Sequence, residues 1–225
     1  MLFNSKIVYN KITQENYIME KVHLEGYTKF RSEYYSDNKE LFENLANGQS
    51  PHSMVITCSD SRVEPSTILS SKPGDLFVAR NIGNIVPPYK PAKGSTQAAI
   101  EYAVVALQIE HMVILGHSAC GACAHLYHEP VEGEAELLHV EEWLKLSYPA
   151  KNAAMLEFHA DKTKILSEIT EKNNIQLSIE RLMTYPYIID ALEAGTIKLH
   201  GWWYNVGSAE LEIYNYGTKQ FEPAK

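Results

Sequence analysis

The 225-residue sequence contains only 3 cysteines, and so few thiols, odd in number, exclude a disulfide framework. It also lacks the run of roughly 20 apolar residues that a membrane-spanning helix needs, since even the apolar stretch 98–107 is interrupted by Glu101. The first residues show no apolar core followed by a small-residue cleavage site, so we expect no signal peptide and predict a cytoplasmic location. In that reducing compartment the thiols are free to bind a metal or to react.

Basic side chains are also in short supply. The chain has 20 Lys and Arg against 28 Asp and Glu, a net charge of −8, which argues against a nucleic-acid partner. Neither the phosphate-binding pattern G-x-x-x-x-G-K-[ST] nor the dinucleotide pattern G-x-G-x-x-G occurs. The apolar fraction of 45% and the charged fraction of 21% are ordinary for a globular protein, and no stretch resembles a linker, so we predict one domain.

Short apolar runs at 54–57, 76–79 and 112–115 predict buried strands. Continuous apolar strands that alternate with helices are typical of a parallel sheet covered on both faces, so the predicted fold class is α/β. A helix over 95–108, capped by Ser95 or Thr96, lies between the second and third of these strands. The spacing of apolar residues predicts further helices over 15–46, 135–146, 152–172, 176–184 and 186–194, and strands over 197–204 and 210–216.

Two groups of metal-ligand residue types follow the first and third predicted strands, at 58–62 (CSDSR) and 117–123 (HSACGAC). Carboxyl ends of neighbouring parallel strands meet at one sheet edge, where ligands bind in open α/β sheets. Cys58, His117 and Cys120 together supply three preferred ligands of zinc and leave the fourth position open, as in catalytic zinc sites. Adding Cys123 gives a closed, structural site, and this alternative stays open at this point. An Asp and an Arg two and four residues after Cys58 have little use in a purely structural site.

Other sites with these residue types fail on spacing. A cysteine-phosphatase loop needs Arg six residues after its Cys, where Glu64 stands. A nucleophile elbow G-x-S-x-G around Ser118 lacks its last glycine, because that position is Cys120. A thioredoxin-like C-x-x-C at 120–123 leaves the 58–62 motif without a role.

The two motifs, about sixty residues apart, resemble those of the β-class carbonic anhydrases of bacteria, plants and fungi. The stretches 80–84 (RNIGN), 87–88 (PP), 98–104 (AAIEYAV) and 201–202 (GW) are also similar to that family, so the resemblance covers about residues 40 to 216. It implies a central, mostly parallel sheet flanked by helices, with an added antiparallel edge strand. It also implies a zinc-binding core over 51–225 and an N-terminal helical arm over 1–50 that wraps over a partner in a homo-oligomer, a dimer or tetramer. One zinc per chain is implied on Cys58, His117 and Cys120, and Cys123 has no ligand counterpart.

The resemblance also implies substrate-binding residues. A plant-like subgroup has a Gln nine residues before the first cysteine ligand, where Gln49 stands, and lines its pocket with aromatic residues partly from across the dimer interface. The predicted substrate-binding residues are Gln49, Phe77, Ile82, Tyr102 and Gly121. Another subgroup has an inhibitory bicarbonate site that needs Trp where this chain has Val55, so we expect no such site here, although Arg80 matches its arginine.

The implied function is the zinc-dependent, reversible hydration of carbon dioxide to bicarbonate and a proton, the reaction of a carbon–oxygen lyase. The attacking group is zinc-bound hydroxide, whose proton Asp60 accepts, while Arg62 keeps Asp60 ionised and oriented. Two alternatives remain: a hydrolase of carbon disulfide or carbonyl sulfide on the same zinc site, and a non-catalytic protein that binds zinc or bicarbonate.

Overall fold

The computed structural model describes residues 17–90 and 94–224, and the chain divides into two compact units, the first ending at Gln49 and the second beginning at Ser50. The first unit contains α2 (Tyr17–Phe30), the π-helix η1 (Arg31–Tyr35) and α3 (Lys39–Leu45). These helices confirm the helical pattern predicted over 15–46, of which residues 15–16 lie outside the described part. The rings of Phe30, Tyr34 and Tyr35 surround that of Phe42, at centroid distances of 5.8, 6.2 and 5.1 Å. No described side chain from 21 to 49 is buried.

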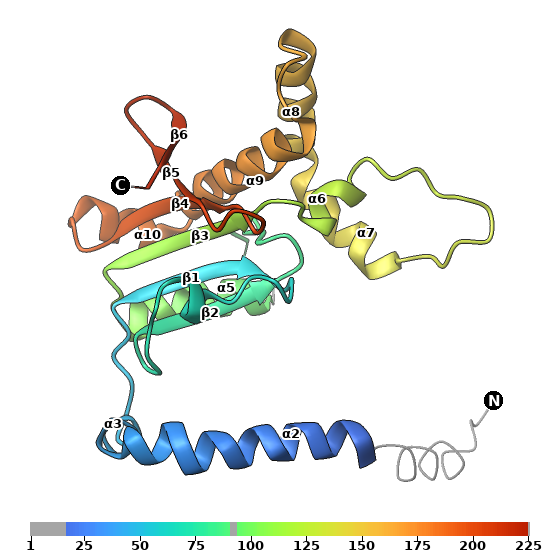
Figure 1. The fold of residues 1–225 in the computed structure, drawn as a ribbon. Coiled ribbons are helices and arrows are strands. Elements are labelled where there is room, and N and C mark those ends of the chain that lie inside the picture. The colour runs from blue at the N-terminus through green and yellow to red at the C-terminus, as the bar shows by residue number, and fades with distance from the viewer. Residues whose placement is uncertain (1–16, 91–93, 225) are drawn as a thin grey trace, which may run out of the picture. The chain divides into compact units, whose positions relative to one another are not determined.

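The second unit is built on the predicted α/β sheet, whose six strands run in the order β2-β1-β3-β4-β5-β6 (Figure 1). The strands are β1 (Ser53–Cys58), β2 (Leu76–Asn81), β3 (His111–His117), β4 (Lys198–Tyr204), β5 (Leu211–Asn215) and β6 (Gln220–Pro223). β1 pairs in parallel with β2 and β3, and β3 pairs in parallel with β4. β5 and β6 are antiparallel, so the edge carries two added strands where the sequence predicted one.

Helices cover one face of this sheet. The largest apolar cluster joins Met54 and Ile114 of the strands to residues of α5 (Ser95–Glu101), α9 (Leu166–Leu182) and α10 (Pro186–Glu193). The π-helix η2 (Tyr102–Ala106) continues α5 and contributes Ala103. On the other face, a smaller cluster packs Val55 and Leu115 under Val63 and α4 (Pro65–Ile68). Every residue of β1 is therefore buried because both faces of the sheet are covered at this strand, as is typical of parallel sheets.

The remaining helices are α6 (Gly121–His125), α7 (Leu138–Leu144), the 3-10 helix η3 (Lys145–Ser147) and α8 (Tyr148–Ala160). The predicted helices 152–172 and 176–184 are wrong in their boundaries. The chain leaves the helix at Asp161, whose Oδ1 accepts hydrogen bonds from the Thr163 main-chain N–H and hydroxyl at 3.0 and 2.6 Å, and α9 then runs unbroken through Asn174.

The predicted cap at Ser95 or Thr96 is also wrong, because the N-cap of α5 is Gly94 and no side chain caps it. In the described ranges no helix is long and apolar enough to cross a membrane.

Candidate metal centre

The two motifs meet where β1 and β3 end. These strands pair in parallel with Thr57 opposite Leu115, so the chain leaves the sheet at Cys58 on one strand and at His117 on its neighbour. Cys120 follows three residues later as the N-cap of α6. The topology therefore brings two segments that are sixty residues apart to one sheet edge.

Cys58, His117 and Cys120 form a compact set of possible metal ligands. One ligand atom from each lies within 4.8 Å of the other two, and it is the one such group found in the described part of the chain. All three side chains are buried, with residue exposures of 5%, 0% and 2%. Tetrahedral zinc with two thiolates and one imidazole holds its ligand atoms roughly 3.5–3.8 Å apart, so the set fits zinc in residue type and in spacing.

The imidazole of His117 is oriented for a metal. Its Nδ1 lies 2.9 Å from the main-chain oxygen of Ser118, which can only accept, so Nδ1 carries the proton. Its Nε2 is buried and has no hydrogen-bond partner among the described residues. A buried nitrogen lone pair without a donor is costly unless a cation occupies the site, so this atom supports a metal next to the two thiols.

The thiols are held protonated as long as no cation is near them. A hydrogen bond with Cys120, together with burial, raises the pKa of Cys58 to about 12. A hydrogen bond with Cys123 is the main cause that raises the pKa of Cys120, also to about 12. Cys123 is 4% exposed and packs against the other two cysteines, but it does not belong to the ligand group. The geometry therefore favours three ligands and an open position over a closed four-ligand site.

Asp60 and Arg62 form a two-pronged ion pair beside the ligands. Asp60 Oδ1 accepts hydrogen bonds from the main-chain N–H and the Nε of Arg62, both at 2.9 Å, and Oδ2 accepts one from Nη2 at 2.7 Å. These contacts hold the pKa of Asp60 well below its usual range, so the carboxylate is ionised. Asp60 Oδ2 lies 3.9 Å from His117 Nε2, which places the carboxylate next to the ligand cluster.

Arg80 fixes the segment that carries Cys58 and Asp60. Its Nε donates to the main-chain oxygen of Cys58 at 3.1 Å, and its Nη2 donates to those of Asp60 and Val63 at 2.8 and 2.7 Å. Its Nη1 pairs with Glu64 at 3.0 Å. This role of Arg80 was not predicted from the sequence, because it depends on the loop after β1 folding back over β2.

Glu171 is a second residue that contacts the metal centre and that was not predicted from the sequence. It lies on α9, is 3% exposed, and accepts the main-chain N–H of Cys120 at 3.1 Å and the indole N–H of Trp203 at 3.0 Å. Burial raises the pKa of Glu171, and the two N–H donors oppose that effect. Its position one turn before Ile175, on the buried face of α9, was a signal in the sequence that could have revealed it.

The predicted substrate residues are only partly brought together. The rings of Phe77 and Tyr102 lie 5.9 Å apart, but Phe77 pairs with Met54, four residues or about 13 Å along the strand from Cys58. Ile82 follows β2 and is 41% exposed, and Gly121 begins α6. Gln49 belongs to the first unit. The substrate-binding role of all five stays a prediction.

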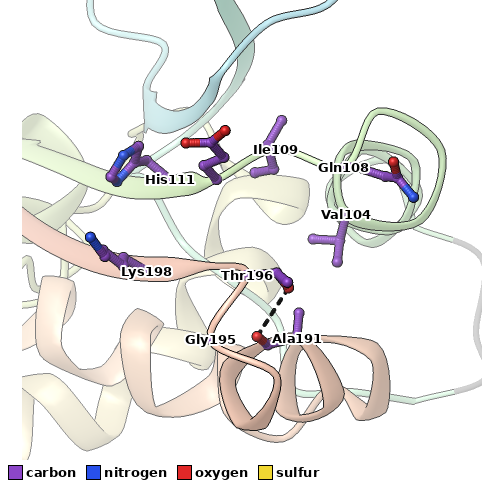
Figure 2. A pocket seen from close by; sticks show the side chains of 9 residues that line it. Val104, Gln108, Ile109, His111, Ala191, Gly195, Thr196 and Lys198 are labelled. Carbon is purple, nitrogen blue, oxygen red and sulfur yellow. Dashed lines mark hydrogen bonds between the residues drawn. The ribbon is translucent and has the colours of Figure 1, made fainter.

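A cavity of about 550 Å³ lies elsewhere (Figure 2). Its lining includes His111 and Lys198, the first residues of β3 and β4, whereas the metal ligands lie at the opposite ends of the parallel strands, at Cys58 and His117, or just after, at Cys120. This cavity is therefore not part of the metal centre.

Comparison with known proteins agrees with this geometry. A family model described as "Carbonic anhydrase" matches residues 53–211. A carbonic anhydrase of Synechocystis is 41% identical over 192 residues, which are 85% of this chain and 70% of that protein, and one of Helicobacter pylori is 34% identical over 206 residues, 88% and 91% of the two chains. The solved β-carbonic anhydrase CcaA superimposes with a TM-score of 0.85 at 38% identity over 92% of both chains. One of two tetrameric β-carbonic anhydrases from Sordaria macrospora gives a TM-score of 0.76 at 32% identity, over 87% of this chain and 96% of that one.

Proposed function

The chain belongs to the β-class carbonic anhydrases and is a carbonic anhydrase with a Cys-His-Cys zinc site, and from this premise we propose the roles of its individual residues. Cys58, His117 and Cys120 hold one zinc ion per chain. When bound, zinc lowers the pKa of a coordinated water toward neutrality, an effect best known from carbonic anhydrases themselves. The substrates are carbon dioxide and bicarbonate.

Asp60 accepts a hydrogen bond from the group that attacks carbon dioxide and so orients that group. Each carboxylate oxygen has two acceptor sites, and Arg62 occupies both sites on Oδ1 but one on Oδ2. The remaining site therefore belongs to Oδ2, the oxygen 3.9 Å from His117 Nε2. This free acceptor site on Oδ2 is the observation that carries the proposal. Because the Asp60 carboxylate is ionised and lies beside the metal ligands, it can fix the direction of the attacking group by a hydrogen bond, and neither Asp60 nor Arg62 has to take up a proton.

Arg62 holds both Asp60 and the turn of residues 118–120, which carries Cys120 and is called the ligand turn below. Its Nη2 also donates to the main-chain oxygen of Ala119 at 3.0 Å, so one guanidinium links the carboxylate to the residue before Cys120. The bidentate pair also keeps Asp60 directed at Arg62, so that the carboxylate does not close the metal's open position.

A linear, apolar molecule such as carbon dioxide needs an apolar wall, which is formed by Phe77, Ile82 and Tyr102. Gln49 or the Gly121 amide donates a hydrogen bond to a bicarbonate oxygen. Because Phe77 lies about 13 Å along the strand from the Cys58 of its own chain, we assign the Phe77–Tyr102 pair to the metal centre of a second copy. The functional protein is accordingly a homo-oligomer, a dimer or tetramer. A tetrameric relative supports this assembly.

Metal analysis combined with a stopped-flow assay of carbon dioxide hydration tests the proposal. We expect one zinc per chain and loss of both zinc and activity in Cys58→Ala, His117→Ala and Cys120→Ala. Cys123→Ser is the matched control and should keep its zinc. Retention of zinc by any of the three alanine variants contradicts that ligand assignment, and turnover of carbon disulfide in place of carbon dioxide contradicts the substrate.

A further inference from the structure

Glu171 is a buried acid behind the metal centre that the reaction does not use. It is 3% exposed, and no Lys or Arg in the described ranges forms an ion pair with it, since the neighbouring Lys172 pairs with Glu168 and Glu212. Burial of an acid without a cation is costly, so such a residue persists only where its hydrogen bonds serve the surrounding structure.

Both partners of Glu171 are obligatory donors. The main-chain N–H of Cys120 reaches Oε1 at 3.1 Å, and the indole N–H of Trp203 reaches Oε2 at 3.0 Å. Neither group can accept a hydrogen bond, so the side chain between them must accept at both ends. A carboxylate does so, whereas the amide of Gln necessarily turns its NH₂ toward one of the two donors.

The contact falls on the part of the ligand turn that most needs support. Ala119 has a φ of +53°, a left-handed conformation that is strained for a non-glycine residue. Cys120 follows directly as the N-cap of α6, and the N-terminus of this helix has no capping hydrogen bond from a side chain. Trp203 lies on β4 opposite Gly116 of β3, the residue before His117. Glu171 thus connects the turn that carries Cys120 to α9 and to the strand next to the other ligand.

We propose that Glu171 is a positioning residue of the metal centre, which fixes Cys120 by accepting its main-chain N–H and is itself held by Trp203. This inference rests on the proposed ligand role of Cys120. Glu171 touches the ligand turn and not the reacting atoms, so its effect appears first in metal binding.

The substitution E171Q tests the requirement for two acceptors. We expect zinc affinity, measured by competition with a chromophoric chelator, to fall by roughly 10- to 100-fold, the usual effect of losing a group that orients a ligand. The single variant W203F should stay within a few-fold of wild type. In E171Q/W203F the amide oxygen can face Cys120 while its NH₂ no longer faces an N–H donor, so affinity should return to the level of W203F. If the double variant binds zinc no better than E171Q, the proposal is overturned.

A second pair of variants keeps the test valid if E171Q does not fold. E171L/W203F has no acceptor for the Cys120 N–H, whereas E171Q/W203F has one, and both replace Trp203 in the same way. We expect the Leu variant to bind zinc at least 10-fold more weakly and to show a weaker cobalt–thiolate absorption band when loaded with Co²⁺. Equal metal affinities with a lower melting temperature of the metal-free Leu variant indicate a purely structural role and overturn the proposal. Zinc retention by C120A instead refutes the underlying ligand assignment.

Discussion

The carboxylate of Asp60 receives all three of its hydrogen bonds in the described structure from Arg62, two from the guanidinium and one from the main-chain N–H, so the two residues act as one group. Asp60→Asn replaces an acceptor oxygen by a donor, and Arg62→Ala leaves the carboxylate with the main-chain N–H of residue 62 but without the guanidinium. We expect each change to lower kcat for carbon dioxide hydration by about 10²-fold, the usual effect of losing a group that orients the reactants, while zinc remains bound. Stopped-flow kinetics with zinc analysis measures both quantities.

Asp75→Asn is the control for the dyad, because Asp75 also accepts a main-chain N–H, that of Lys72 at 2.7 Å, but lies outside the metal centre. Near-normal kcat in Asp60→Asn or in Arg62→Ala would remove the dyad from the mechanism.

The sequence could predict the ligands but not the residues that position them. Cys58, His117 and Cys120 are revealed by residue type at strand ends, which is a local property of the chain. Arg80 and Glu171 act through main-chain groups that are 20 and 51 residues away, at Asp60 and Cys120. A main-chain donor or acceptor has no signature in the sequence, so such contacts become visible only in three dimensions.

The pairing of β3 with β4 contains a histidine pair that makes stability depend on pH. His111 Nδ1 and His200 Nε2 lie 3.0 Å apart. Burial, His111 and Lys198 lower the pKa of His200 below its ordinary value of 6.5, so the unfolded chain binds this proton more readily than the folded one. The contribution of His200 to stability is therefore complete above pH 6.5 and is lost as the pH falls below it.

We expect the free energy of unfolding to fall between pH 7 and pH 5 and to fall less steeply in His200→Gln. Chemical denaturation at several pH values measures this slope. His139→Gln, at an exposed position on α7, is the control and should keep the wild-type slope. Identical slopes for wild type and His200→Gln would show that another group causes the loss.

Close packing of α9 against β3 depends on a glycine beside a ligand. A Cβ at Gly116 would lie 2.7 and 2.8 Å from Cδ1 and Cγ1 of Ile175, which is fully buried. Gly116→Ala should lower the free energy of unfolding by about 1–3 kcal/mol, as overpacking usually does. Because Ile175→Ala removes both atoms, the double variant should lose less stability than the sum of the single losses, as measured by urea denaturation. Additive losses would contradict this contact, and Gly26→Ala, with open space around it, should cost nothing.

The helices and strands that could be predicted from the sequence are those whose position depends on one dominant physical cause. The strands β1 and β3 are continuous apolar runs because both of their faces are covered, and this pattern identified them. Helix boundaries in α8 and α9 depend on tertiary contacts: Asn174, a residue unfavourable inside helices, is kept within α9 by hydrogen bonds to Gly83 and Ser147 at 2.7 Å each. β6, which pairs with β5 through a short turn, has no comparable apolar run and was missed.

At the scale of the whole molecule, the first unit carries an apolar stripe that the described residues of that unit leave partly exposed. Leu24, Tyr27, Phe30 and Tyr34 recur at three- and four-residue steps and are 54%, 56%, 41% and 40% exposed. An apolar stripe of this kind is typical of an interface with another chain. We expect the double variant L24E/Y27E to form smaller species than wild type in sedimentation experiments.

The substitutions K21A/E25A remove an exposed ion pair from the same helix and serve as the control for the stripe. This control should leave the assembly unchanged. An unaltered sedimentation profile of L24E/Y27E would show that the stripe does not hold the copies together.

The assignment of Phe77 and Tyr102 to the metal centre of a second copy predicts complementation between inactive variants. Asp60→Asn damages the dyad of its own centre, and Phe77→Ala/Tyr102→Ala damages the pocket wall that its chain lends to the partner. In a mixed dimer, one centre then has an intact dyad and an intact wall, while the other has neither. When the two variants are mixed in equal amounts and allowed to exchange subunits, half of the dimers are mixed, so the hydration rate should recover to about a quarter of the wild-type value. A mixture no more active than the mean of its two components would place the aromatic pair at the metal centre of its own chain.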